Sequence, residues 1–177
     1  MRFETTEIPG VISITAPVHE DERGSFNRLV DLEAFAGAGL PTVFAQVSQS
    51  RNVKCGTLRG LHYQEHPHEE DKVVSCTHGE AFDVVVDLRP DSPSYCKWLG
   101  LHLSVGRSVF VPRGCAHGFL TLTQDTDLVY FITTPHVSGA ARVLRFNDPI
   151  FGIRWPRPIT SINKRDLVAP NYVPRAT

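Results

Sequence analysis

The sequence lacks any long apolar run, and this absence excludes a membrane-spanning helix. No stretch approaches the ~18 apolar residues that such a helix needs, and the densest one, residues 81–88, is interrupted by Asp83 and Asp87. The N-terminal segment is polar and acidic, without the apolar core of a signal peptide. We therefore expect neither a membrane span nor a secretion signal.

Cysteine is scarce and shows no pairing pattern. Cys55, Cys76, Cys96 and Cys115 are about twenty residues apart and include no C-x-x-C pair. This spacing argues against zinc ribbons and against a disulfide framework. We expect reduced cysteines in a cytoplasmic protein.

The chain also has no excess of charge of either sign. Eighteen basic and nineteen acidic side chains give a formal net charge of −1. Proteins that bind nucleic acid or membrane surfaces usually carry a strong basic patch, so we expect neither partner. No repeat, low-complexity tract or linker divides the chain, and its length fits a single domain, 1–177.

Short segments rich in Val, Phe, Leu and Thr dominate the sequence, and turn signals separate them. Without a strong amphipathic helix between them, they predict an all-β fold, an antiparallel sandwich or barrel. We expect one short helix at 32–38 and an irregular, proline-rich tail with a short helix near 163–167. The predicted strands are residues 43–50, 57–64, 72–76, 80–88, 98–104, 108–112, 118–123, 128–134 and 143–147.

Alternation along a strand predicts which side chains share a face. Val73 and Val74 should point to opposite faces, and so should Val84 and Val85. Asp83 falls on the same face as Val85. A carboxylate on an otherwise apolar strand is costly unless it is paired, so an interior Asp83 needs a Lys, Arg or His across from it.

The first concentration of chemically active side chains begins in the strand at 57–64. His62 stands mid-strand between Arg59 and Gln64. It is either a core histidine bonded to a neighbour or a general base that faces a cavity. Strict alternation places Arg59 and His62 on opposite faces, so a shared pocket requires a bulge at Gly60.

A second motif runs from Gly106 through Pro112 and Gly114 to His117. Its spacing matches the second signature motif of the jelly-roll barrels called cupins, with Thr121 in place of their usual asparagine. Pro112 and Gly114 would form the turn between two strands, and His117 would enter the barrel on the second. A single histidine at this point either ligates a metal, binds an anion or packs.

A metal site needs three or four ligands, which metal-binding cupins take from an H-x-H pattern, a later glutamate and the second-motif histidine. Residues 66–70 are an imperfect substitute, because the carboxylates follow the histidines too soon and Pro67 indicates an exposed loop. We therefore expect no metal and no other cofactor.

Two further candidates remain open on the residues alone. Tyr130 lies late in a strand expected beside that of His117, where a core tyrosine is the simplest interpretation. Residues 163–166 form a charged cluster in the tail, which by itself indicates a solvated face.

Taken together, these residues resemble the dTDP-4-dehydrorhamnose 3,5-epimerase family of nucleotide-sugar epimerases, which has the cupin jelly-roll fold. The similarity covers nearly the whole chain. Its most specific segments are R-G-L-H-Y-Q at 59–64 and H-G-F at 117–119. The other matching segments are residues 21–26, 83–89, 92–93, 111–117, 148–149, 155–156 and 165–166.

The resemblance implies a metal-free reaction at sugars whose C4 ketone acidifies the hydrogens on C3 and C5. His62 would be the base that removes one of them, and Asp166 would fix the tautomer of its ring. Lys72 would stabilise the enolate that develops at O4. Tyr130 would return a proton on the opposite face of the carbanion.

The resemblance also implies a homodimer that binds a nucleotide-diphosphate sugar. Arg59 and Arg23 would hold the diphosphate, with Arg23 supplied by the partner chain. The other implied substrate-binding positions are Phe26, Arg28, Gln46, Ser48, His117, His136 and Arg165.

Five positions depart from the pattern of the family. Arg28 and Ala141 stand where glutamates are expected, and His136 replaces a tyrosine. Ser48 ends a motif that is otherwise Q-x-N, and Phe131 replaces a lysine that often follows the catalytic tyrosine. These changes predict a preference for another nucleotide-linked 4-keto sugar, or epimerisation at one centre only.

Three functions therefore stay open. The first is epimerisation of a nucleotide-linked 4-keto-6-deoxy sugar at C3 and C5. The second is epimerisation at only one of these centres, or of a sugar on another nucleotide. The third, a catalytically silent sugar-binding cupin, is disfavoured because His62 and Asp166 are both present.

Overall fold

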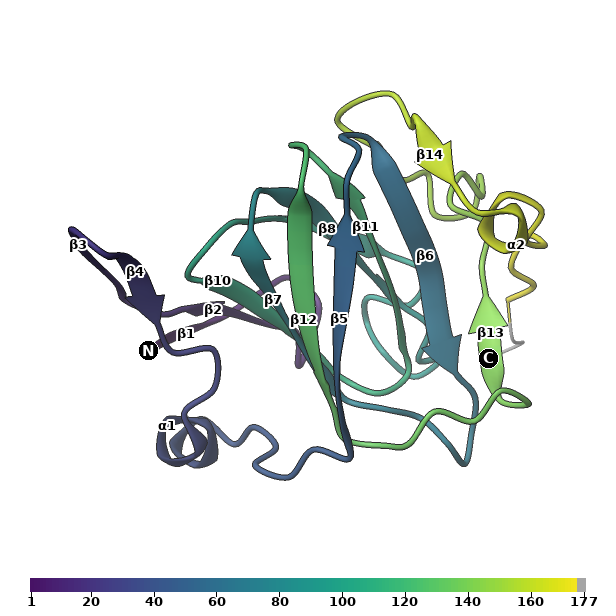
Figure 1. The fold of residues 1–177 in the computed structure, drawn as a ribbon. Helices are drawn as coiled ribbons and strands as arrows, with labels where there is room; N and C mark the ends of the chain where they lie inside the picture. The colour runs from purple at the N-terminus through teal and green to yellow at the C-terminus, as the bar shows by residue number, and fades with distance from the viewer. Residues whose placement is uncertain (175–177) are drawn as a thin grey trace.

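The computed structural model describes residues 1–174, which form two main antiparallel sheets packed face to face (Figure 1). The first sheet has the order β1 (Arg2–Thr5), β2 (Ile12–Thr15), β10 (Arg107–Val111), β7 (Lys72–His78), β12 (Thr126–Ile132) and β5 (Gln46–Asn52). The second has the order β13 (Ala141–Val143), β6 (Thr57–Gln64), β11 (Cys115–Thr121), β8 (Ala81–Asp87) and β9 (Trp98–Leu103). This architecture confirms the all-β jelly-roll prediction.

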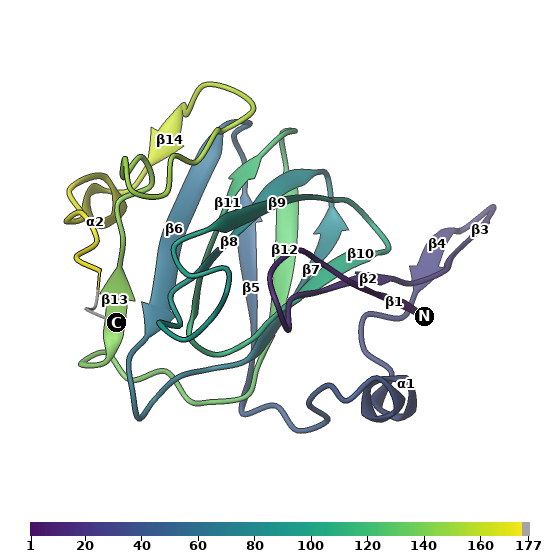
Figure 2. The same ribbon diagram turned by 180° about the vertical axis from the view of Figure 1, so that it is seen from behind.

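The remaining elements are short. β3 (Val18–Asp21) and β4 (Gly24–Asn27) form a hairpin that projects from the body of the molecule, while β14 (Ser161–Ile162) pairs with β6 in parallel (Figures 1 and 2). The helices α1 (Leu32–Gly37) and α2 (Lys164–Leu167) each begin at a side chain that caps a backbone amide. No helix in the described residues is long and apolar enough to cross a membrane.

Eight of the nine predicted strands are present, and the one at 57–64 matches β6 at both ends. The other seven differ by a few residues at their ends, where turn residues blur the boundary. The prediction of a strand at 143–147 is wrong beyond Val143, because β13 ends there and the chain turns, with the amide of Asp148 donating to the carbonyl of Arg145. Both predicted helices are also confirmed. The pattern does not predict β1 to β4, because each has four residues and none shows an alternating buried face.

Apolar side chains form three layers around the two sheets. The central layer, between the sheets, contains Val74 and Val85, both fully buried. Val84 packs in a second layer, on the outer face of the second sheet, and Val73 packs with Phe35 of α1 in a third layer, outside the first sheet. The alternation predicted for β7 and β8 is therefore confirmed. Full burial of such a side chain contributes about 1.5–3 kcal/mol to the free energy of unfolding.

The buried carboxylate of Asp83 is paired, as the sequence requires. It lies in the interior on β8, and its Oδ2 is 2.7 Å from Nε2 of His117 on the adjacent β11. Both side chains are buried, and the contact gives Oδ2 of Asp83 a partner, whereas its Oδ1 is buried without a hydrogen-bond partner among the described residues.

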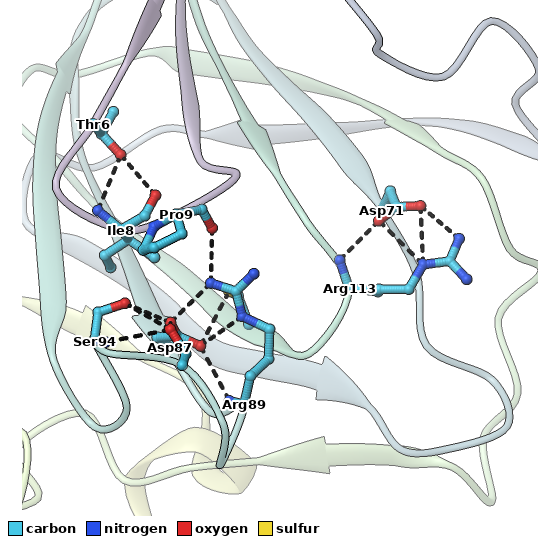
Figure 3. A network of polar contacts seen from close by, with 10 residues as sticks. Thr6, Ile8, Pro9, Asp71, Asp87, Arg89, Ser94 and Arg113 are labelled. Carbon is cyan, nitrogen blue, oxygen red and sulfur yellow. Dashed lines mark hydrogen bonds and ion pairs between the residues drawn. The ribbon is translucent and has the colours of Figure 1, made fainter.

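A second buried carboxylate, Asp87, organises the turn after β8. It accepts hydrogen bonds from Arg89 and Ser94 (Figure 3) and also from Ser92. Arg89 also donates to the carbonyl of Pro9 at 2.8 Å and so attaches the N-terminal loop to this turn. Burial alone would raise the pKa of Asp87, but the guanidinium and the two hydroxyls outweigh it and hold the pKa at about 2.

The depressed pKa of Asp87 predicts a loss of stability in acid. Its folded pKa of about 2 lies below the usual value of 3.8, so its contribution is complete above that value and disappears as the pH falls toward 2. We expect this group to contribute about 2 kcal/mol to the free energy of unfolding at neutral pH.

Urea unfolding of Asp87→Asn across pH 2–7 measures this contribution. The variant should have a lower free energy of unfolding at pH 7. It should also lack the part of the fall in this free energy, between pH 3.8 and about 2, that protonation of Asp87 causes in the wild type. Asp91→Asn, which changes an exposed carboxyl in the same turn, is the control. The same pH dependence in Asp87→Asn and the wild type would contradict the assignment.

Candidate active site

A cavity of about 320 Å³ lies between the two sheets, with walls from β5, β6, β7, β11 and β12. It brings together residues that are far apart in the sequence. Nine of the predicted site residues line it: Gln46, Ser48, Arg59, His62, Lys72, His117, Tyr130, His136 and Arg165. A tenth, Asp166, bonds to His62 from outside the cavity wall.

A larger hollow of about 510 Å³ lies beside the outer layer of the second sheet, next to residues 88–91 and 170–173. Its arginines are already paired, Arg89 with Asp87 and Arg142 with Glu65, both at 2.7 Å. None of the predicted catalytic residues lines it. The smaller cavity is therefore the candidate active site.

His62 and Asp166 form the central contact of the site. Nε2 of His62 lies 2.9 Å from Oδ1 of Asp166, whose side chain has no exposed surface, whereas that of His62 is 45% exposed. Burial alone would raise the pKa of Asp166, but the hydrogen bonds from His62 and from the amide of Gly60 lower it below its usual value. The carboxylate therefore stays ionised and orients the imidazole.

The tail presents Asp166 to β6 through local capping. Asn163 caps α2 by accepting a hydrogen bond of 2.8 Å from the amide of Asp166, and its side-chain amide donates to Oδ2 at 3.1 Å. The parallel pairing of Ser161 and Ile162 with β6 fixes the start of this helix. The interpretation of residues 163–166 as a solvated face is therefore wrong for Asp166, whose side chain is buried.

A bulge at Gly60 brings Arg59 and His62 to the same cavity. His62 pairs with His117 and Arg59 with Phe119, so three steps on β6 oppose two on β11. Gly60 has φ +115°, and a Cβ there would lie 2.6 Å from Cα of Gly118. Only glycine fits both the backbone conformation and the space. The predicted bulge is confirmed.

Arg59 is oriented by contacts with β5. Its Nε donates to Oδ1 of Asn52 at 2.7 Å, and Nη2 donates to the carbonyl of Arg51 at 3.4 Å. Asn52 is itself buried and donates to the carbonyl of Thr126 at 2.9 Å. The guanidinium therefore has a fixed direction at the cavity wall.

Tyr130 faces the cavity from β12. Its ring stands edge-on to that of His117, with 6.1 Å between the ring centroids. Burial, and then the negative charge of Asp83, raise the pKa of Tyr130 well above its usual value. The phenol therefore keeps its proton at neutral pH.

Three predicted substrate-binding residues lie outside the cavity of their own chain. Arg23 and Phe26 belong to the projecting β3–β4 hairpin, where the Phe26 side chain is 68% exposed. Arg28 follows the hairpin and pairs with Asp31 at 2.7 Å. Of the other departures, Phe131 packs on the outer face of β12, 5.6 Å from the ring of Phe44.

Ser50, Gln64 and Glu70 also line the cavity, although the sequence analysis assigns no role to any of them. Alternation could have found two of them, since Ser50 follows Ser48 by two residues and Gln64 follows His62 by two. For Glu70, the only sequence pattern that includes it is the incomplete metal pattern at 66–70, which gives no sign of a contact with Lys72.

Residues 1–174 contain no group of three or more His, Cys, Asp or Glu side chains that could hold a metal ion. His62, His66 and His117 each face a single carboxylate. The expectation of a reaction without metal stays a prediction.

Comparison with known proteins identifies the relatives of the chain. The family model described as dTDP-4-dehydrorhamnose 3,5-epimerase matches residues 5–173. A curated protein of that name from Sinorhizobium fredii is 37% identical over 174 residues, which cover 97% of this chain and 89% of the relative.

Solved structures give the same picture. A 4-keto-6-deoxy sugar epimerase from the novobiocin biosynthetic gene cluster of Streptomyces spheroides has a TM-score of 0.90 at 34% identity, over 97% of this chain and 87% of that one. A 3′-monoepimerase from Streptomyces bikiniensis, solved in complex with dTDP-quinovose, has a TM-score of 0.87 at 32% identity, over 94% and 85%.

Fold and relatives define an isomerase of the cupin class, an epimerase of nucleotide-linked 4-keto-6-deoxy sugars. Within that class, the chain belongs to the dTDP-4-dehydrorhamnose 3,5-epimerase family. The resemblance seen in the sequence is confirmed, and so are the enzyme class and the nucleotide-sugar substrate.

Proposed function

We propose that the cavity lined by His62, Lys72 and Tyr130 is the active site of this epimerase. The observation that carries the proposal is the His62–Asp166 pair, a half-exposed imidazole at the cavity bonded at 2.9 Å to a fully buried, ionised carboxylate. Such a pair suits proton abstraction next to a ketone, which is the first step of epimerisation.

His62 is the proposed base. Because Nε2 donates to Asp166, the other ring nitrogen, Nδ1, is the one that accepts the proton from C3 or C5. A neutral imidazole can accept a proton near pH 7, and the adjacent carboxylate stabilises the imidazolium that forms. No metal enters this scheme.

Lys72 and Tyr130 complete the proposed proton transfers. The ammonium of Lys72 stabilises the negative charge that develops on O4 when the proton leaves. Tyr130 protonates the opposite face of the carbanion, which inverts the centre. The place of Tyr130 in the same cavity as His62 supports this role, since a phenol carries a proton at neutral pH.

The nucleotide diphosphate is the proposed ligand of Arg59 and Arg165, since guanidinium groups match phosphate oxygens in geometry and charge. Both arginines line the cavity. Gln46, Ser48 and His117 are proposed to contact the rest of the substrate. Gln46 also accepts a hydrogen bond of 2.6 Å from the amide of His136, which keeps this rim of the cavity in place.

A panel of nucleotide-linked 4-keto-6-deoxy sugars in D₂O tests the activity. We expect deuterium at C3, C5 or both, read by NMR, with dTDP-4-keto-6-deoxyglucose less efficient than the best member of the panel. His136 and Ala141 support this preference, because both line the cavity where a phenol and a carboxylate are expected. Each buried polar group of the substrate left unpaired costs about 1–3 kcal/mol.

The number of labelled positions separates the candidate functions. Two labelled positions with inverted configuration indicate a double epimerase, and one indicates a single-centre epimerase. No uptake from any sugar would leave a silent binding protein and contradict the proposal. Efficient double epimerisation of dTDP-4-keto-6-deoxyglucose would contradict the proposed preference alone.

Substitutions at the base and the acid should have different effects. His62→Ala should lower exchange at every centre by about 10²- to 10⁴-fold, because no carbanion forms without the base. Tyr130→Phe should keep proton exchange but fail to invert, since His62 can return a proton to the original face. His102→Ala and Tyr95→Phe change the same residue types outside the cavity and serve as controls. Normal epimerisation by Tyr130→Phe would make Tyr130 a packing residue.

We also propose a homodimer in which the β3–β4 hairpin of one subunit completes the site of the other. The hairpin projects from its own chain and carries Arg23 and the exposed Phe26 (Figure 1). Strand β5 lies at an edge of its sheet next to the cavity, with Val47 exposed on it. Arg23 would then add a cation at the diphosphate, and Arg28 would approach the same ligand.

Mixed subunits test this arrangement. Arg23→Ala and His62→Ala variants should each be weakly active alone. Co-expressed, they should recover ~25% of wild-type activity, because half of randomly formed dimers are hybrids and each hybrid has one intact site of two. No recovery, or a protein that sedimentation shows to be a monomer, would contradict the shared site.

A cytoplasmic location and a single domain, 1–177, complete the proposal. The four free cysteines, two of them buried, support a reducing compartment. The central layer joins residues from Ile8 to Leu128 in one apolar cluster, which supports a single folding unit.

A further inference from the structure

Glu70 forms a close ion pair with Lys72 at the active-site cavity. Its Oε1 lies 2.5 Å from Nζ of Lys72, and its side chain is only 11% exposed. Its second oxygen, Oε2, accepts a hydrogen bond of 2.9 Å from Nε2 of Gln64. One carboxylate thus faces two donors, one from β7 and one from β6.

We infer that Glu70 is a positioning residue for the epimerisation: it holds the ammonium of Lys72 in place, and Gln64 holds Glu70. The inference rests on the proposed role of Lys72 at the developing enolate oxygen. Glu70 does not touch the sugar in this scheme and acts through Lys72.

The other contacts of Gln64 determine the orientation of its amide. Its Oε1 accepts a hydrogen bond of 2.7 Å from the amide of Val137, and its Nε2 donates to the carbonyl of His68 at 3.0 Å. Gln64 is buried, and a reversed amide would set carbonyl against carbonyl and N–H against N–H. Nε2 therefore points toward Glu70, where an acceptor is required.

The backbone around Glu70 is held as well. Asp71, between Glu70 and Lys72, accepts a hydrogen bond of 2.8 Å from the amide of Arg113, and its own amide donates to Oγ1 of Thr133 at 3.0 Å. Figure 3 shows the contacts between Asp71 and Arg113. A shift of Glu70 relative to the two sheets would break these bonds.

A fixed ammonium favours catalysis because a lysine side chain loses much rotamer freedom when it becomes ordered. Here the ordering occurs on folding, so Lys72 meets the developing charge without reorganisation. The ion pair also keeps the diphosphate from competing with O4 of the sugar for Lys72, since a mobile ammonium would be drawn to the phosphates. Glu70 retains Lys72 near the sugar and leaves the phosphates to Arg59 and Arg165.

Glu70→Ala tests the inference with the best substrate of the panel above. We expect kcat, measured as deuterium uptake, to fall by about 10- to 100-fold while KM changes less than about threefold, because the contact acts in the transition state. Glu69→Ala is the matched control, since it removes a neighbouring carboxylate that pairs with His66 outside this cavity. It should leave kcat within about twofold of wild type.

A double-mutant comparison distinguishes positioning from a structural role. Without the ammonium, Glu70 has nothing to position, so adding Glu70→Ala to Lys72→Ala should lower the exchange rate by less than about twofold. An equal fall in both backgrounds would overturn the inference. So would a kcat of Glu70→Ala within about twofold of wild type.

Glu70→Gln covers the case in which the alanine variant does not fold. It keeps the volume but offers one acceptor to two donors, so kcat should fall with KM unchanged, and an unchanged kcat would overturn the inference. Full activity in Lys72→Ala would remove the proposed role of Lys72, and that of Glu70 with it. An inactive Lys72→Ala beside a fully active Glu70→Ala would remove only the role of Glu70.

Discussion

The buried carboxylate of Asp166 is the contact on which the arrangement of the site depends. It accepts hydrogen bonds from the ring of His62 and from the amide of Gly60, so one side chain satisfies both the proposed base and the bulge beside it. An ionised carboxylate without exposed surface is very costly unless it is paired. Folding of the tail, formation of the bulge and orientation of the imidazole are therefore coupled.

The proposed catalytic groups come from different strands, and three residues of the site share a pattern of support. Each of the three is held by a carboxylate that is more buried or is itself bonded elsewhere: Asp166 behind His62, Asp83 behind His117, Glu70 behind Lys72. The three groups that they hold are neutral or cationic. In the proposed scheme, donors and cations therefore meet an anionic nucleotide sugar, while each of these carboxylates is paired with one of them.

Local sequence patterns predict the sheets well, because alternation reports burial on each strand separately. The faces of Val73, Val74, Val84 and Val85 follow from that rule, and so does the need of Asp83 for a basic partner, though not the choice of His117. The N-terminal strands escape it because each has only four residues and no alternating buried face. Local patterns cannot predict the contacts of Asp166 and Glu70 either. A carboxylate in a polar segment is expected to be solvated, and only the fold brings a hydrogen-bond donor from a strand to it. Only the family resemblance identified Asp166.

The position of Asp166 in the chain also has a consequence for when activity can appear. Synthesis proceeds from the N-terminus, so the strands that carry His62, Lys72 and Tyr130 are made before α2. A chain that stalls, or is cut by a protease, before α2 would hold His62 without its carboxylate and Gly60 without its acceptor. Such a fragment could retain a cavity and yet lack an oriented base. On the proposed mechanism, an active enzyme is therefore one whose translation has passed α2 and whose tail is still attached.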